Sequence, residues 1–241
     1  MLVSPSPNGF LSRNRFIILF CSLLLFLVSV PVVQELRLAD RAVLPNAVES
    51  AAFFIVLAAA LVSVAQSPSW KYFIVVLGGP VLVLGMLQLF FASDVLAVTR
   101  SLFAVAFIVY VIIVLVFFVS ASRNVTMNTV CAALCVYLLL AVTWAVAYSM
   151  MDIMDPTAIQ SSGGRDDLLL RIGRGGGANV LYFSLCTLTT LGYGDIVPVS
   201  PSARMLAALE SVIGQLYLAV LVARLVGLQI AESMNQSRGG S

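Results

Sequence analysis

The stretch Thr189-Thr190-Leu191-Gly192-Tyr193-Gly194-Asp195, near the C-terminal end, decides how the rest of the chain is interpreted. A Gly-Tyr-Gly sequence can place successive backbone carbonyls along one line, because glycine reaches backbone angles that are closed to other residues. A file of carbonyl oxygens, with a threonine hydroxyl at its inner end, suits a monovalent cation that has lost its water. We call residues Thr190–Gly194 the TLGYG run.

The composition indicates that lipid is the solvent of this chain. Its 241 residues are 61% hydrophobic and 10% charged, and the mean hydropathy is +1.07. Soluble domains are about 45–50% apolar and about 25% charged. The net charge of +2 gives no reason to expect a nucleic-acid partner. Histidine is absent, which removes the commonest general base and the commonest transition-metal ligand.

Six apolar segments reach or approach the roughly 20 residues that a helix needs to cross the hydrocarbon core. They are residues 16–33, 47–65, 72–91, 101–122, 127–151 and 203–230. The first segment is too long for the apolar part of a signal peptide and no small-residue cleavage site follows it, so we expect it to be retained. A tight turn is expected at residues 66–71, between the second and third segments.

The region between the fifth and sixth segments breaks this pattern. Residues 152–178 are rich in glycine and charge, which predicts a water-exposed loop. A short helix is expected from 180 to 189, capped by Asn179 and too short to span the membrane. Ser200 and Pro201 are typical of an N-cap and a first helical position, so they should start the last helix.

The TLGYG run resembles the selectivity filter of tetrameric potassium channels, whose TVGYG loops coordinate the ion through carbonyl oxygens. Leucine replaces the usual valine, at a position that contributes its carbonyl rather than its side chain. The resemblance implies that K⁺ passes through the run and that no organic cofactor is used and no reaction catalysed. The ion's ligands would be Thr190, Leu191, Gly192, Tyr193 and Gly194, supported by Thr189 and Asp195.

The resemblance also implies an architecture. The resemblance is specific over about residues 180–215, and elsewhere it rests on the arrangement of the apolar segments alone. The implied architecture is an all-α membrane protein with six transmembrane helices and a re-entrant pore helix and filter between helices five and six. Residues 1–123 would form a four-helix sensor-like domain, and residues 124–241 the pore domain. One chain holds one such run, and extended backbone at membrane depth is tolerated only where it lines a path enclosed by protein. We therefore expect a homotetrameric pore.

Three residues of the last segment suggest functional roles. Gly214 lies twenty-two residues after Gly192, the spacing of the gating-hinge glycine in the family resembled. Close helix packing is the competing interpretation, because membrane helices use small residues at their contacts. Glu210 and Arg224 are charges within a membrane segment, which makes them candidates for function. Arg224 is expected to extend to the interface, and the role of Glu210 stays open.

The fourth segment departs from the voltage-gated relatives. A working sensor repeats arginine or lysine at every third residue, whereas residues 101–122 carry no charge between Arg100 and Arg123. We therefore expect a channel without intrinsic voltage gating. Many potassium channels also pair the aspartate after the filter with an acidic residue of the pore helix, and Cys186 occupies that position here.

Tyr193 favours potassium selectivity, because relatives that pass sodium often carry another residue between the two glycines. In the family resembled, this tyrosine packs outward against the pore helix. Tyr182 and Phe183 lie on that helix here and are expected to receive it.

Several alternatives compete with a potassium channel. A weakly selective cation channel and a regulatory channel subunit belong to the same class. A membrane thiol redox protein belongs to another class and would use Cys21, Cys131, Cys135 and Cys186. None of these cysteines forms a C-x-x-C pair, and buried, inert thiols are the simpler interpretation.

The resemblance implies a location as well. Because the filter loop of the family enters from outside, both termini are expected in the cytoplasm. A compact chain of this kind suggests a prokaryotic inner membrane, with lipids and a still unidentified gating partner as further partners.

Overall fold

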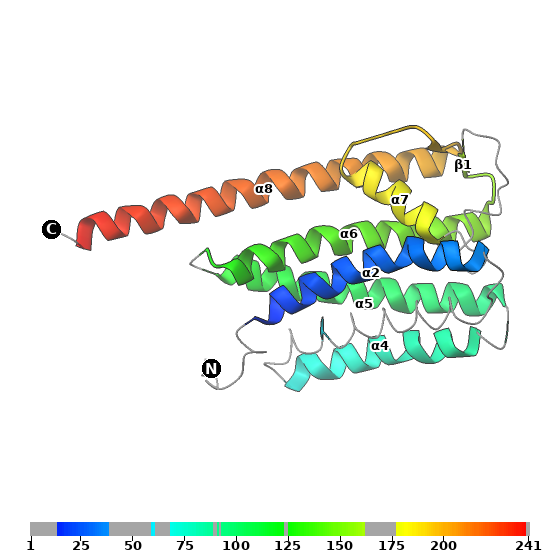
Figure 1. The fold of residues 1–241 in the computed structure, drawn as a ribbon, viewed down its shortest axis with the longest axis horizontal. Coiled ribbons are helices and arrows are strands. Elements are labelled where there is room, and N and C mark those ends of the chain that lie inside the picture. The colour runs from blue at the N-terminus through cyan, green and yellow to red at the C-terminus, as the bar shows by residue number, and fades with distance from the viewer. Residues whose placement is uncertain are drawn as a thin grey trace.

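The computed structural model describes residues 14–38, 59–60, 68–88, 91, 93–122, 125–161 and 177–239, and these are almost entirely helical (Figure 1). The elements are α2 (Arg15–Leu38), α4 (Pro68–Gln88), α5 (Asp94–Ala121), α6 (Met127–Met154), β1 (Ile159–Ser161), α7 (Gly177–Leu188), β2 (Ile196–Pro198) and α8 (Pro201–Gly239). The second predicted span, 47–65, lies outside the described residues except for Ala59 and Ala60.

The long helices lie side by side and roughly parallel to one axis (Figure 1). Helix α5 packs between α4 and α6, and α2 lies against α6. Helix α7 is short and inclined, and it contacts both α6 and α8. Helix α8 extends well past the others and ends at the end of the molecule where α2 begins. The arrangement leaves much of α8 without neighbours in the protomer.

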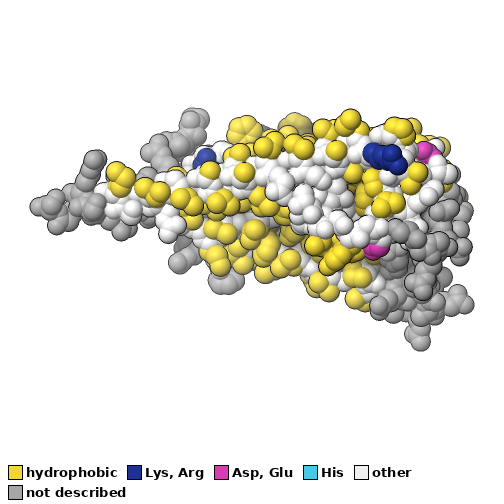
Figure 2. All heavy atoms as spheres, turned by 90° about the horizontal axis from the view of Figure 1, so that it is seen from above, with side chains coloured by type: hydrophobic (Ala, Val, Ile, Leu, Met, Phe, Trp, Pro, Cys, Tyr) yellow, Lys and Arg dark blue, Asp and Glu magenta, His cyan; other side chains and the backbone are white. Residues whose placement is uncertain are grey.

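The prediction of an all-α membrane protein is confirmed by the apolar helices. Among the described residues, four helices are long and apolar enough to cross a membrane: Arg15–Val32, Val95–Ala121, Met127–Met154 and Pro201–Ile230. The third predicted span is not one of them, because the apolar part of α4 is the shorter stretch Val75–Gln88. Figure 2 shows hydrophobic side chains over most of one face, with the few charged ones toward its ends. Such a surface fits lipid as the solvent.

Two helices begin earlier than the sequence suggested. Helix α4 begins at Pro68, so residues 68–71 are helical and the turn predicted there is wrong. Proline suits the first helical position because its fixed φ is helical and its missing N–H would have no partner there. Helix α5 begins at Asp94, seven residues before the predicted start. Arg100 therefore lies within α5, and its Nη1 donates to Gln88 Oε1 at 2.8 Å.

Two buried clusters form the core. The first joins α2, α5 and α6 and includes Phe16, Leu19, Leu23, Val111, Leu115, Cys135 and Val136. The second surrounds α7 and includes Tyr148, Ile159, Val180, Leu181, Phe183 and Ala203. Because the second cluster draws on α6, β1, α7 and α8, it fixes the position of α7 and of the residues that follow it.

A short two-stranded sheet secures the segment after the TLGYG run. Strand β1 pairs antiparallel with β2, with Ile159 opposite Pro198, and the Val199 N–H donates to the Ala158 carbonyl at 2.8 Å. The sequence had predicted a loop for all of residues 152–178. That prediction is wrong for the last turn of α6, which continues to Met154, and for β1. The pairing ties the end of the run to the end of α6.

Candidate functional site

Helix α7 carries the TLGYG run at its C-terminal end. The helix starts at Gly177, so Asn179 lies in its first turn and the predicted capping role of Asn179 is wrong. The start of α8 is as predicted: the helix begins at Pro201, and Ser200 Oγ accepts the N–H of Ala203 at 3.2 Å. The run thus lies between two helices whose adjoining ends are well defined.

A Schellman motif ends α7. The Leu191 N–H donates to the Cys186 carbonyl at 2.8 Å, and the Thr190 N–H donates to the Thr187 carbonyl at 3.0 Å. These are the two bonds that define this motif, in which the left-handed residue is usually glycine. Here that residue is Thr190, with φ +59°. A β-branched residue is strained in this region, and such strain is kept where a side chain has a function.

Left-handed residues alternate along the run. Gly192 (φ +59°) and Gly194 (φ +76°) share the positive φ of Thr190, whereas Leu191 and Tyr193 do not. In a uniform strand, successive carbonyls point to opposite sides. A change in the sign of φ at every second residue lets them face the same side, and glycine adopts the positive sign without cost. The backbone of the run is therefore compatible with a ladder of carbonyl oxygens.

The run is open to its surroundings in a single protomer. Every residue from 189 to 195 is exposed. Leu191 is 55% exposed and Tyr193 is 69% exposed, although both side chains are large and apolar. In a single protomer these side chains are therefore left for lipid or for another molecule to cover.

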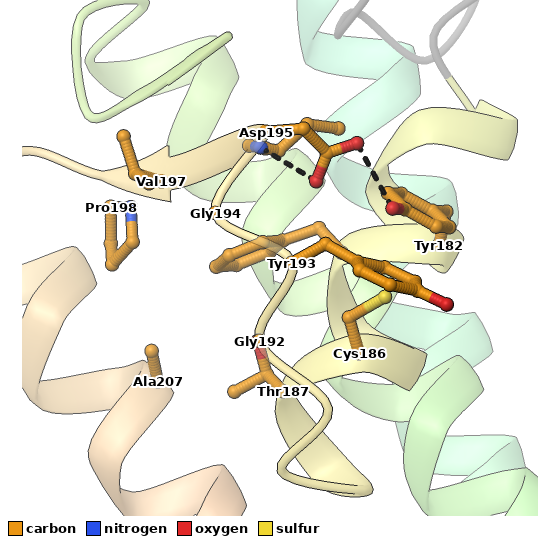
Figure 3. A pocket seen from close by; sticks show the side chains of 12 residues that line it. Tyr182, Cys186, Thr187, Gly192, Tyr193, Gly194, Asp195, Val197, Pro198 and Ala207 are labelled. Carbon is orange, nitrogen blue, oxygen red and sulfur yellow. Dashed lines mark hydrogen bonds between the residues drawn. The ribbon is translucent and has the colours of Figure 1, made fainter. Parts of the chain in front are cut away.

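Tyr182 of α7 braces the run in two ways (Figure 3). Its ring is stacked on that of Tyr193, with centroids 6.5 Å apart and planes at 10°. Its hydroxyl donates to Asp195 Oδ2 at 2.9 Å, and Asp195 Oδ1 accepts the N–H of Ile196 at 3.1 Å. A pocket of about 190 Å³ lies between the run, α7 and α8, and Tyr182, Cys186 and Tyr193 are among the residues that line it. Tyr182 of α7 is thus a partner of Asp195 that the sequence did not indicate.

The end of α7 is also anchored from the other side. Ser211 Oγ of α8 donates to the Thr187 carbonyl at 3.0 Å, and the Tyr137 hydroxyl of α6 donates to the Leu188 carbonyl at 3.3 Å. Gln215 Nε2 donates to Thr190 Oγ1 at 3.3 Å. Side chains of α6 and α8 thus reach carbonyls in the last turn of α7, where partners within the helix run out. Ser211 Oγ also lies 3.0 Å from the Ala207 carbonyl of its own helix.

Gly214 lies where α8 crosses this anchored end. It is buried, and a Cβ there would overlap the Leu188 carbonyl oxygen and lie 2.9 Å from Leu188 Cδ1. Close packing of α8 on α7 is enough to account for the glycine. The hinge role stays a prediction, because the structure describes one conformation of α8.

Replacing Gly214 with alanine is expected to lower the melting temperature. Alanine favours a helix interior by about 1 kcal/mol over glycine, but overlap with a backbone atom costs about 1–3 kcal/mol. The matched control is Gly227→Ala, on the same helix with nothing within 4 Å of the added carbon, which should melt at or above the wild-type temperature. If Gly214→Ala melts like the wild type and only its open probability changes, the hinge interpretation is favoured over packing.

Two charged residues of α8 have definite partners. Glu210 is 0% exposed and bonds to Ser184 of α7 and Tyr148 of α6. The Nη2 of Arg224 donates to carbonyls at the end of α5. That its side chain extends to the membrane interface stays a prediction. Sequence patterns show neither set of partners, because both sets are brought together only by helix packing.

The cysteines give no support to a redox site. All four are free, and Cys131, Cys135 and Cys186 are buried as expected, whereas Cys21 is exposed. Among the described residues, no group of three histidine, cysteine, aspartate or glutamate side chains is placed to hold a metal ion.

A comparison with known families bears on the same region. Residues 173–228 match the family model described as Ion channel, a stretch that includes α7, the TLGYG run, β2 and most of the apolar part of α8. No curated protein and no solved structure matches the chain. The match, on a chain built from long apolar helices, supports an ion channel in a membrane.

Proposed function

We propose that this protein is a potassium-selective channel in which four copies surround one pore. The observation that carries the proposal is the alternation of left-handed residues along the exposed TLGYG run, inside the stretch that matches the ion channel family. Carbonyl oxygens of the run and the hydroxyl of Thr190 would replace the water of a K⁺ ion. The ion moves down its gradient, and no bond is made or broken.

The proposed assembly is a homotetramer of six-span subunits, with α7 re-entrant. Support comes from the apolar part of α8, Pro201–Ile230, because only 11% of it is buried within one protomer. Its exposed apolar side chains include Leu209, Val212, Ile213, Leu216 and Val220. A face of this length can be covered by neighbouring copies or line the pore. Both termini would be cytoplasmic, in a prokaryotic inner membrane.

Selectivity for potassium, rather than for cations in general, is favoured by the bracing of the run. The ring of Tyr193 is stacked on Tyr182, whose hydroxyl is bonded to Asp195. Contacts on the side facing α7 would hold four runs at a fixed separation, which suits one ion size better than another. Gating by the protein's own voltage sensor is not proposed, since the membrane part of α5 carries Arg100 near its start and no further charge.

The test is the reversal potential of the purified protein in a planar bilayer with K⁺ on one side and Na⁺ on the other. We expect a potential far from zero, with the sign of a K⁺ current, and no current in protein-free bilayers. A reversal potential near zero would favour a weakly selective cation channel. An intact tetramer without current would favour a regulatory subunit.

A further inference from the structure

The carboxyl group of Glu210 lies at the meeting point of three helices. It projects from α8 and is 0% exposed. The Tyr148 hydroxyl of α6 donates to its Oε2 at 2.7 Å, and Ser184 Oγ of α7 lies 2.5 Å from its Oε1. Tyr148 and Ser184 are themselves fully buried. Both partners are neutral hydroxyls, and no arginine or lysine of the described residues pairs with Glu210.

The number of available protons constrains this cluster. Ser184 has one hydroxyl proton but two oxygens within reach, because the Ala141 carbonyl lies 2.8 Å away and Glu210 Oε1 lies 2.5 Å away. A carboxylate only accepts hydrogen bonds, so an ionised Glu210 would share a single proton with a helix carbonyl. A protonated Glu210 removes the conflict, since its own proton goes to Ser184 Oγ and the serine proton goes to Ala141.

We propose that Glu210 carries a proton and is the positioning residue that ties α7, and with it the TLGYG run, to α6 and α8. The bonds then follow one direction, from Tyr148 to Glu210, from Glu210 to Ser184 and from Ser184 to the Ala141 carbonyl. Every polar atom of the cluster is satisfied. A buried polar network fixes geometry when all its members are paired, and an unpaired buried charge would cost far more than the network contributes.

The position of the cluster explains why it bears on the run. Ser184 is a buried residue of α7, four residues before Leu188, and Glu210 is four residues before Gly214 on α8. The bond between Ser184 and Glu210 and the close contact of Gly214 with Leu188 therefore hold two successive turns of α7 against α8. Loss of the bond between Ser184 and Glu210 would leave the end of α7, where the run begins, free to shift.

The first test compares Glu210→Gln with Glu210→Ala. A carboxamide keeps one acceptor for Tyr148 and a donor for Ser184, so it reproduces the protonated acid. We expect the glutamine variant to melt close to the wild-type temperature and to pass K⁺ at a similar rate. The alanine variant should melt about 5 °C lower, because a buried hydroxyl loses its partner, and should lose flux. A glutamine variant as impaired as the alanine variant would overturn the proposal, because it would show that the charge is needed.

The second test reads the proton directly. The infrared difference spectrum of wild type minus Glu210→Gln should contain the C=O band of a protonated carboxylic acid, and carboxylate bands in its place would overturn the proposal. Neither the infrared spectrum nor the melting temperature depends on ion flux. If the wild type fails to conduct K⁺, the proposed channel function on which the flux readout rests is wrong, while these two measurements still decide the state of Glu210.

Ser149 provides a control for the loss of a buried serine hydroxyl at Ser184. Ser149 is 2% exposed on α6, and its Oγ donates only within its own helix, to the Ala145 carbonyl at 2.7 Å. Ser184→Ala should lower the melting temperature clearly more than Ser149→Ala does. Equal shifts would contradict a network that joins the three helices.

Discussion

Replacing Gly192 with alanine is expected to abolish selective K⁺ conduction while leaving the protein folded. Gly192 has φ +59°, and a left-handed L-residue costs about 1–2 kcal/mol. In a pore of four copies that cost arises four times at one level of the filter, roughly 4–8 kcal/mol. The added Cβ would meet no atom within 4 Å, so the expected loss comes from the backbone angle and not from a clash. The measurement is K⁺ flux into liposomes, together with the reversal potential.

Gly79→Ala is the matched control for this prediction. Gly79 lies in α4, has an ordinary helical φ and also has nothing within 4 Å of the added carbon. Because Pro80 follows directly and disfavours a helical residue with a Cβ before it, the helix-propensity gain of alanine, about 1 kcal/mol, should be offset, and conduction should be unchanged. If the Gly192 variant conducts K⁺ as the control does, Gly192 does not belong to a selectivity filter.

The parts of the fold that were predicted from the sequence are those that local chemistry determines. Long apolar segments became α2, α5, α6 and α8, because a helix is the structure that satisfies its own backbone in lipid. The start of α8 followed from Ser200 and Pro201, which act within one turn. The positive φ of both glycines in the run agrees with the backbone freedom that made the run stand out.

The features that were missed depend on residues far apart in the chain. Strand β1 forms because residues 159–161 find partners more than thirty positions later. The bond between Tyr182 and Asp195 joins residues thirteen positions apart, and no spacing rule points to it. Helix α7 begins at Gly177, three residues before the predicted start, and glycine is tolerated at the N-terminal end of a helix. Tertiary contacts decided the first two cases.

Arg224 shows how a charge inside a predicted span can be accommodated by partners within the protein. Its Nη2 lies 2.7 Å from the Val119 carbonyl, 2.6 Å from that of Ser120 and 3.2 Å from that of Ser122. These carbonyls belong to the end of α5, where intrahelical donors run out and the helix carries a partial negative charge. One guanidinium thus joins α5 to α8. If α8 lines a pore, this contact couples a movement of α5 to it.

Removal of this contact is expected to have the largest effect on stability of any charge substitution in α8. Hydrogen bonds to charged groups contribute about 1.5–3 kcal/mol each but do not add fully, so a net loss of about 3–5 kcal/mol is reasonable for Arg224→Ala. For a chain of this size the melting temperature should fall by about 10 °C. Faster hydrogen exchange is expected at the last turn of α5.

Arg204→Ala is the control for Arg224→Ala, because Arg204 is an exposed arginine of the same helix whose Nε makes one bond, to the Pro198 carbonyl at 3.3 Å. Its melting temperature should change by no more than about 2 °C, as for other exposed sites. Arg224→Lys keeps the charge but replaces the planar fork by a point charge, so it should recover part of the loss. If Arg224→Ala and Arg204→Ala melt alike, the contact with α5 contributes nothing to stability, and it would not couple α8 to α5.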